Sequence, residues 1–204
     1  MATRRRAKED RQVELTDAAL RIIATHGIAA LTTRRLAAEV GLSSGAIFRH
    51  FASLDELLGA VVARAEAVLA ATVPPATLPP LTQLDHFISA RSAAVGGQPG
   101  ILRLVLSEQF QLALPARGSQ RLAACVQRTR GFVVAALRAG QADGSVRDDV
   151  AAETLAPIVI GTVQALALAP LRGSRSGADR VRAGLLTLLH PVTTARAAPR
   201  KRSS

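Results

Sequence analysis

The chain has 204 residues, of which 49% are apolar and only 2% are aromatic, and its formal net charge is +11. This length allows a small domain fused to a larger one, and an apolar content dominated by Ala and Leu favours helices over strands, which need β-branched and aromatic residues. A single cysteine, Cys125, excludes an intrachain disulfide and a thiolate metal cluster, so we expect a cytoplasmic protein.

Arginine carries almost all of the positive charge, with lysine only at Lys8 and Lys201. Such an excess indicates an anionic partner, and guanidinium groups suit phosphate and guanine, which favours nucleic acid over a membrane surface. An arginine-rich genome would give the same charge and stays an alternative. The first residues are basic but no apolar run follows them, so we expect no secretory signal and a disordered basic arm over 1–8.

Apolar residues at helical spacing predict a first helix over 9–26. Leu15, Ala18 and Ile22 share one face of it, and Gly27 follows as a C-terminal stop.

Two very short helices follow, joined by a glycine turn. Thr32 or Thr33 caps the first, which ends just before Gly41, where the tight turn begins. Ser43 caps the second, over 44–50.

The next helix is longer and opens with a capping box, Ser53 and Glu56, and it runs to about Ala71. Two very short helices between two longer ones are the arrangement of a helix-turn-helix, so the sequence predicts a DNA-binding domain over 9–71.

Four prolines within 73–80 end that helix and predict a domain boundary. The following region, 81–190, has recurring helical patterns without strand alternation, which predicts a helical bundle. We expect its helices over 81–95, 101–114, 119–142, 150–171 and 177–189, and a disordered basic tail over 191–204.

The stretch LTTRRLAAEVGLSSGAIFRHFASLDELL, residues 31–58, with the preceding AALRIIATHGIAA, resembles the signature of the TetR family of transcriptional regulators. The match depends on the joint spacing of glycines, apolar residues and a His-Phe pair: Gly27, Thr33, Leu36, Ala37, Gly41, His50 and Phe51. The resemblance implies an all-α protein, with an N-terminal three-helix domain that binds DNA through a helix-turn-helix at 32–51. It also implies a C-terminal helical domain that dimerises and often encloses a ligand.

The resemblance further implies which residues contact DNA. Thr33 and Arg34 lie where family members contact phosphate and base, and His50 matches a recurrent histidine that contacts the DNA backbone. The full candidate set is Thr32, Thr33, Arg34, Ser43, Ser44, Gly45, Ala46, Phe48, Arg49 and His50. Arg34 is our candidate for reading a guanine, because serines discriminate bases weakly. The alternative roles are caps for Thr32 and Ser43, core packing for Phe48, and solvated surface charge for Arg35 and Arg49.

Two positions depart from the family pattern. Phe48 stands where many members have a tyrosine whose hydroxyl binds phosphate, and Leu54 stands where many have a lysine. Arg49 and the basic arm could compensate for these contacts electrostatically.

The stretch 150–171 is apolar around its whole circumference, which predicts a helix buried on every side. From residue 154 onward it has no charge and is nearly long enough to cross a bilayer, but Pro157, Thr162 and Gln164 favour a buried helix. Together with the amphipathic 183–190, it predicts a four-helix interface between two copies of the chain. Small residues at every fourth position would let these helices approach closely: Gly161, Ala165 and Ala169.

A ligand pocket is predicted where three phenylalanines lie on successive helices, Phe87, Phe110 and Phe132. Arg91, Cys125 and Gln164 are its candidate polar groups. The alternative is that the phenylalanines are plain core and that Cys125 is a small buried apolar residue.

The leading functional hypothesis is a homodimeric repressor that binds a near-palindromic duplex and is released by a small apolar or amphipathic effector. The alternative is a DNA-binding protein without an effector, regulated by a protein partner or acting architecturally. An enzyme is disfavoured, because the histidines are scattered and no metal-binding pair, phosphate loop or nucleophile elbow occurs, so we expect no cofactor and no metal. A peripheral membrane protein would be supported by little beyond the charge and one apolar helix.

Overall fold

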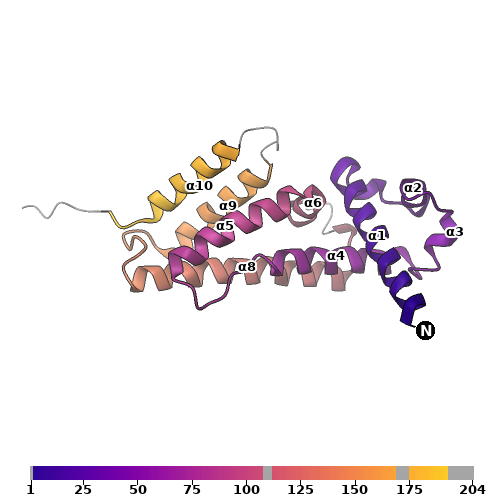
Figure 1. Cartoon of the computed structure of the whole chain (residues 1–204), viewed down its shortest axis with the longest axis horizontal. Coiled ribbons are helices and arrows are strands. Elements are labelled where there is room, and N and C mark those ends of the chain that lie inside the picture. The colour runs from indigo at the N-terminus through magenta and orange to yellow at the C-terminus, as the bar shows by residue number, and fades with distance from the viewer. Residues whose placement is uncertain (1, 108–111, 169–174, 193–204) are drawn as a thin grey trace, which may run out of the picture.

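The computed structural model describes residues 2–107, 112–168 and 175–192, and every regular element within these ranges is a helix (Figure 1). This confirms the predicted all-α class. The helices are α1 (Ala2–His26), η1 (Ile28–Ala30), α2 (Thr33–Glu39), α3 (Ser44–Ile47), α4 (Leu54–Ala70), α5 (Pro80–Gly96), α6 (Pro99–Leu106), α8 (Ala116–Ala142), α9 (Ala152–Leu168) and α10 (Arg175–Leu189).

The N-terminal helices follow the predicted order, with one difference at the start. Helix α1 begins at Ala2, so residues 2–8 are helical and not the disordered arm that we expected. The sequence offers no breaker there, and Ala, Arg and Lys all favour helix. Gly27 ends α1 with a φ of 79°, a conformation that a side chain would disfavour.

Side-chain caps start the next three helices, as the sequence predicts. The hydroxyl oxygen of Thr32 accepts from the N–H of Arg35 at 3.2 Å, that of Ser43 from Ala46 at 3.2 Å, and that of Ser53 from Glu56 at 3.1 Å. These bonds satisfy N–H groups that a helix start leaves unpaired.

Helix α3 is shorter than predicted and ends at Ile47, not at residue 50. The N–H groups of Arg49 and His50 bond to carbonyls three residues back, at 3.2 and 2.9 Å, so the chain tightens into turns. Gly41, with a φ of 66°, forms the predicted turn between α2 and α3.

In the C-terminal region the predicted helix over 101–114 is wrong, because α6 ends at Leu106 and Ser107 is extended, with a ψ of 116°. Residues 169–171 of the predicted helix over 150–171, and residues 193–204 of the predicted tail, lie outside the described residues. Among the described residues, no helix has the length and apolar character needed to cross a membrane.

Two apolar clusters form the core, and their division does not follow the proline-rich segment. The first joins α1–α4 to Val95 of α5, to α6 and to the N-terminal half of α8, whose contribution includes Leu122 and Cys125. The second joins α5, the C-terminal half of α8, α9 and α10. The N-terminal helices and the near part of the larger bundle therefore share the first cluster.

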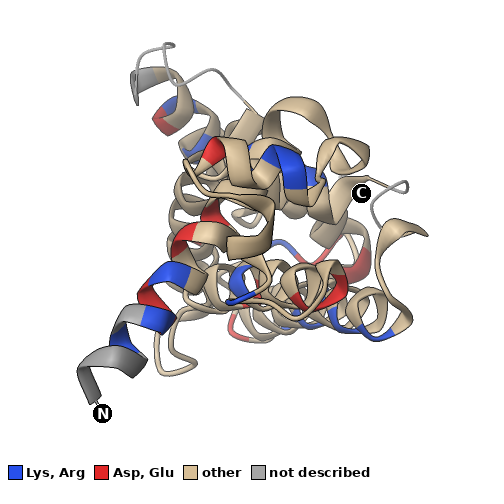
Figure 2. Cartoon of the chain, turned by 90° about the vertical axis from the view of Figure 1, so that its right-hand side faces the viewer, with Lys and Arg blue, Asp and Glu red and all other residues tan. Residues whose placement is uncertain are grey.

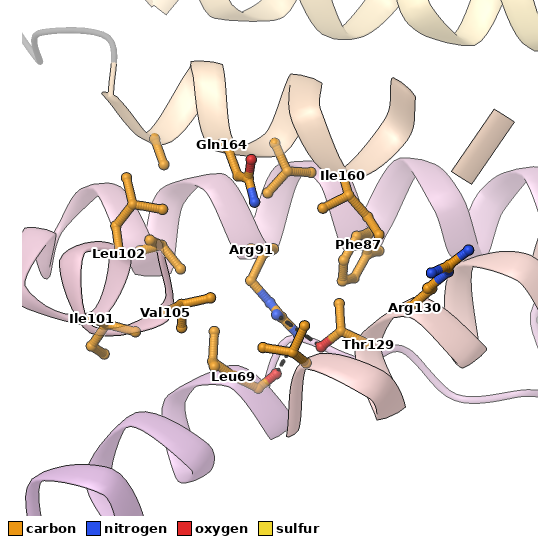
Figure 3. A pocket seen from close by; sticks show the side chains of 14 residues that line it. Leu69, Phe87, Arg91, Ile101, Leu102, Val105, Thr129, Arg130, Ile160 and Gln164 are labelled. Carbon is orange, nitrogen blue, oxygen red and sulfur yellow. Dashed lines mark hydrogen bonds between the residues drawn. The ribbon is translucent and has the colours of Figure 1, made fainter. Parts of the chain in front are cut away.

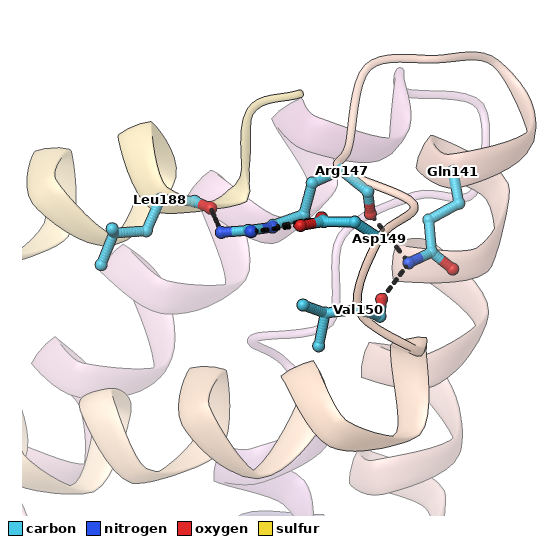
Figure 4. Close-up of polar contacts among 5 residues, drawn as sticks. All are labelled: Gln141, Arg147, Asp149, Val150 and Leu188. Carbon is cyan, nitrogen blue, oxygen red and sulfur yellow. Dashed lines mark hydrogen bonds and ion pairs between the residues drawn. The ribbon is translucent and has the colours of Figure 1, made fainter. Parts of the chain in front are cut away.

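A polar clamp holds the α8–α9 connection against the end of α10 (Figure 4). Arg147 donates from Nε and Nη2 to the two carboxylate oxygens of Asp149, at 2.7 and 2.6 Å, and its backbone N–H donates to the carbonyl of Leu189 at 2.8 Å. Gln141 donates to the carbonyls of Arg147 and Val150, at 2.9 and 2.8 Å. The clamp satisfies backbone groups in an irregular segment and fixes where α10 ends.

Candidate functional site

Helices α2 and α3 lie at one end of the elongated molecule, beyond α1 (Figure 1). Leu36, Ile47 and Phe51 are buried beneath them in the cluster that contains the apolar side of α1. Because this inner face is fixed by packing, the outer face of α2 and α3 is presented rigidly to solvent.

Most of the predicted DNA-contacting residues share this outer face. The exposed members are Thr32, Arg34, Ser43, Ser44, Gly45, Phe48 and Arg49, and Thr33 and His50 are partly buried. Arg34, Arg35 and Arg49 have no ion-pair partner within the described part of the chain. Guanidinium groups without a carboxylate are available to phosphate and to base edges.

Ala46 corrects the predicted set, because its side chain is only 4% exposed. It points into the domain while its backbone N–H is occupied by the cap at Ser43. Phe48 also differs from one of our interpretations: it is 50% exposed and therefore does not serve as core.

A cluster of basic groups surrounds His50. Burial, and then the positive charges of Arg11, Arg49 and Lys8, lower the pKa of His50 below its ordinary value. Its Nδ1 is buried and has no hydrogen-bond partner among the described residues. Arg11 is ion-paired with Glu14 at 2.6 Å, so Lys8 and Arg49 are the cations beside His50 that suit an anion, as a DNA phosphate would be.

Helix α1 contributes to this cluster, which the sequence analysis did not anticipate. Gln12 donates from Nε2 to the carbonyl of His50 at 2.8 Å and so ties the exit of α3 to α1. Figure 2 shows basic residues interleaved with acidic ones along the first turns of α1. The missed signal was the spacing of Lys8 and Arg11, which places both on one face of a helix that the sequence analysis expected to begin at residue 9.

A cavity of about 160 Å³ lies in the larger bundle and is lined by side chains of α4, α5, α6, α8 and α9 (Figure 3). Three predicted pocket residues line it, Phe87, Arg91 and Gln164. Most of the other lining residues are aliphatic, among them Leu69, Ile101, Leu102, Val105 and Ile160.

The remaining predicted pocket residues do not line this cavity. Phe132 instead packs its ring against that of Phe87, with centroids 5.3 Å apart, and so supports the wall from behind. Cys125 is buried in the first apolar cluster, as the alternative reading held. Phe110 lies outside the described residues.

Arg91 is the unusual member of the cavity wall, because it is a guanidinium only 6% exposed. It donates from Nε to the Thr72 hydroxyl at 2.5 Å, from Nη1 to the Thr129 hydroxyl at 3.3 Å and from Nη2 to the Leu69 carbonyl at 2.7 Å. Its carbon Cζ lies 4.9 Å from the centre of the Phe87 ring. Burial lowers the pKa of Arg91 to about 10, and no carboxylate pairs with it in the described ranges.

A third surface is the outer face of α9 and α10. The predicted burial of α9 on every side is not met within one chain, since Ile158 is 51% and Leu168 is 66% exposed. Val181 and Leu188 of the adjoining α10 are 49% and 64% exposed. An apolar face of this kind is typical of protein–protein contact.

Comparison with known proteins gives this geometry its context. Residues 15–61 match the family model described as "Bacterial regulatory proteins, tetR family". The chain is 29% identical over 160 residues to the HTH-type transcriptional repressor KstR2 of Rhodococcus jostii (strain RHA1), a match that covers 72% of each chain.

Solved structures agree on the fold. The ketosteroid transcriptional regulator KstR2 of Mycobacterium tuberculosis is similar with a TM-score of 0.77 and 21% identity, over 88% of this chain and 95% of that one. AibR, solved with isovaleryl coenzyme A and operator DNA, is similar with a TM-score of 0.75 and 15% identity, over 88% of this chain and 97% of that one. Residues 15–61, the segment that matches the family model, contain α2 and α3, which carry the exposed arginines and the helix caps. The chain is thus similar to regulators of the tetR family, in sequence over residues 15–61 and in fold over most of its length.

Proposed function

We propose that the protein is a homodimeric repressor that binds a near-palindromic operator in the cytoplasm and releases it when a small molecule occupies the cavity around Arg91. The observation that carries the proposal is the pairing of two features in one packed body. Arginines without ion-pair partners among the described residues lie on the outer face of α2 and α3, and a cavity of about 160 Å³ lies in the larger bundle. The relatives are named as transcriptional regulators, which supports a role without catalysis.

On DNA, the N-terminal residues of α3 enter the major groove and Arg34 reads a guanine from the start of α2. Thr33, Arg49 and His50 contact the backbone, and Ser43 and Ser44 supply short polar contacts to base edges. Phe48 is exposed beside them and offers an apolar contact to a thymine methyl group.

Two copies of the chain pair through α9 and α10. Their exposed apolar side chains would then be buried in a four-helix interface, and a two-fold axis would set the two recognition helices roughly 34 Å apart, or a multiple of it. The clamp at Arg147 supports this arrangement, because it fixes the end of α10.

Occupation of the cavity reaches the DNA-binding end through two packed contacts. Arg91 bonds to Leu69 and Thr72 at the end of α4, and α6 supplies Ile101, Leu102 and Val105 to the cavity while it packs on α1. A ligand that favours the arrangement unable to bind DNA must be weakened by DNA to the same extent, typically by about 5- to 150-fold. A relative in structure, AibR, was solved with both a coenzyme A thioester and operator DNA, which supports a ligand-responsive mechanism.

The test begins with selection of bound fragments from genomic DNA. We expect one near-palindromic motif, bound by two chains per site, as measured by gel shift and sedimentation. Compounds that raise the melting temperature are then titrated with and without the selected operator. A strict monomer that selects no sequence would refute the DNA-binding proposal.

The alternative is a regulator of the same kind without a small-molecule effector, controlled by a protein partner or acting architecturally. A broad library of apolar and amphipathic compounds that yields no binder would favour it. A binder with equal affinity in both titrations would not be the effector.

A further inference from the structure

We propose that the ligand of the cavity is a compact carboxylate with an apolar body of about six carbons, whose carboxylate pairs with Arg91. The inference depends on the proposed function only in calling this ligand the effector. It stands on the geometry of the cavity in all other respects.

Arg91 carries a buried charge that no neighbouring group among the described residues neutralises. Arg91 is cationic at neutral pH, is 6% exposed and has no carboxylate partner in the described ranges. Its three hydrogen bonds go to two hydroxyls and a carbonyl, which are neutral acceptors. A buried charge without a counter-ion is costly, so an anion in the cavity would relieve an existing electrostatic penalty.

The guanidinium of Arg91 also has N–H groups left to donate. The three bonds use one N–H on each of Nε, Nη1 and Nη2, which leaves one N–H on Nη1 and one on Nη2 without a partner among the described residues. Two donors on neighbouring nitrogens match the two oxygens of a carboxylate. Figure 3 places Arg91 in the middle of the lining side chains, so its side chain lies where an occupant would meet it.

The size and polarity of the cavity indicate the body of the ligand. A cavity of about 160 Å³ is close to the roughly 150 Å³ that accommodates benzene in an engineered apolar site. Its walls are largely aliphatic, with the Phe87 ring on one side. A neutral ligand would leave the guanidinium unpaired while removing more water from it, so the cavity favours an acid over its neutral counterpart.

The test uses matched pairs of acid and amide on the full chain, benzoate with benzamide and hexanoate with hexanamide, measured by isothermal titration calorimetry without DNA. We expect each acid to bind at least tenfold more tightly than its amide. Arg91→Met should remove this preference by weakening acid binding. Equal affinity of acid and amide, or no binding by either acid, would overturn the proposal.

Arg117→Met is the control, because Arg117 is exposed on α8 and does not line the cavity. It should leave the acid preference intact, and loss of the preference in this variant would overturn the assignment to Arg91. Arg91→Lys keeps the charge without the planar fork and should retain part of the preference, which guards against misfolding of the Met variant. Tighter binding of hexanoyl coenzyme A than of hexanoate would also contradict a carboxylate site.

A separate titration with operator DNA distinguishes this inference from the proposed function. An acid preference that depends on Arg91 but leaves operator affinity unchanged supports the carboxylate site and refutes the effector role. Release of the operator by a neutral compound, together with no acid preference, supports the effector role and refutes the carboxylate site.

Discussion

Arg34 and Arg35 are neighbours at the start of α2, and both are exposed without an ion-pair partner among the described residues. Charge and exposure therefore cannot separate a base-reading arginine from a solvated one. The resemblance assigns base contact to the position of Arg34. Mutation can distinguish the two arginines, because loss of a base contact changes the preferred sequence, whereas loss of a backbone contact weakens binding to all sequences alike.

Arg34→Ala should relax the preference at one base pair in each half-site and cost roughly 1–3 kcal/mol at the preferred site, since a bidentate guanine contact would be lost. The measurement is repeated selection of binding sites, followed by titration of the wild-type motif and its variants. Arg35→Ala is the matched control and should keep the selected motif. An unchanged motif for Arg34→Ala would show that another residue reads the base.

His50 gives the DNA-binding end a dependence on pH. Its folded pKa lies below the ordinary value of about 6.5, because burial and the charges of Arg11, Arg49 and Lys8 disfavour the protonated ring. The unfolded chain therefore binds a proton more readily than the folded one. The contribution to stability is complete above about pH 6.5 and is lost as the pH falls through the lower folded pKa.

We expect the free energy of unfolding in urea to fall between about pH 6.5 and 5, a window above the ordinary titration of carboxylates. His50→Gln should flatten this part of the profile. His190→Gln, at an exposed position, is the control and should leave the slope as it is. A slope that persists in the His50 variant would assign the dependence to other groups.

At the scale of single elements, prediction worked where local chemistry decides the structure. The caps at Thr32, Ser43 and Ser53 and the turn at Gly41 could be read directly, because each requires only its own residue type and spacing. Prediction failed where packing or a backbone turn decides, as at Ser107, where a periodic apolar pattern continues in the sequence but the helix ends. The basic cluster around His50 was also missed in part, since α1 and α3 meet only in the folded chain.

At Gly100, α6 lies so close to α1 that a Cβ would overlap the carbonyl oxygen of Leu20. Gly100→Ala must push α6 away from α1, and we expect a loss of roughly 1–3 kcal/mol of stability. Since α6 also lines the cavity, the same variant should reduce the factor by which an effector weakens operator binding.

Gly140→Ala provides the control, because a Cβ there would overlap the Val146 side chain, far from α1. It should cost a comparable amount of stability and leave the coupling factor unchanged. The measurements are urea denaturation and effector titrations with and without operator. Equal loss of coupling in both variants would mean that coupling follows stability and not the α6–α1 contact.

At the scale of the whole molecule, composition and helical periodicity were enough for the all-α class, but the packing between the two predicted regions was not readable from the chain. The proline-rich segment marks a boundary along the sequence, whereas the first apolar cluster passes across it into α6 and α8. A proline determines the local backbone conformation, whereas the extent of a hydrophobic core depends on which helix faces, distant in the sequence, pack together. Likewise, only some of the residues that line the cavity could be predicted from the sequence, because five helices contribute to its wall.

In the proposed dimer, the apolar face of α9 and α10 holds the two DNA-binding ends together. Ile158 and Leu188 are both more than half exposed in one chain, and burial against a second chain would remove them from water. Replacing both with glutamate places charges in that interface, which should raise the dimer dissociation constant at least about 100-fold. Val73→Glu, at an apolar position that is 41% exposed between α4 and α5, is the matched control.

Sedimentation velocity and operator titrations test this prediction together. The double variant should be monomeric and should bind the full palindrome little better than a single half-site, because the second recognition helix no longer follows the first into its groove. Its affinity for one half-site should match that of the wild-type monomer, since α2 and α3 lie at the opposite end of the molecule from α10 (Figure 1). A double variant that still sediments as a dimer would place the interface on another surface, and one that loses half-site binding as well would mean that the substitutions had disturbed the fold.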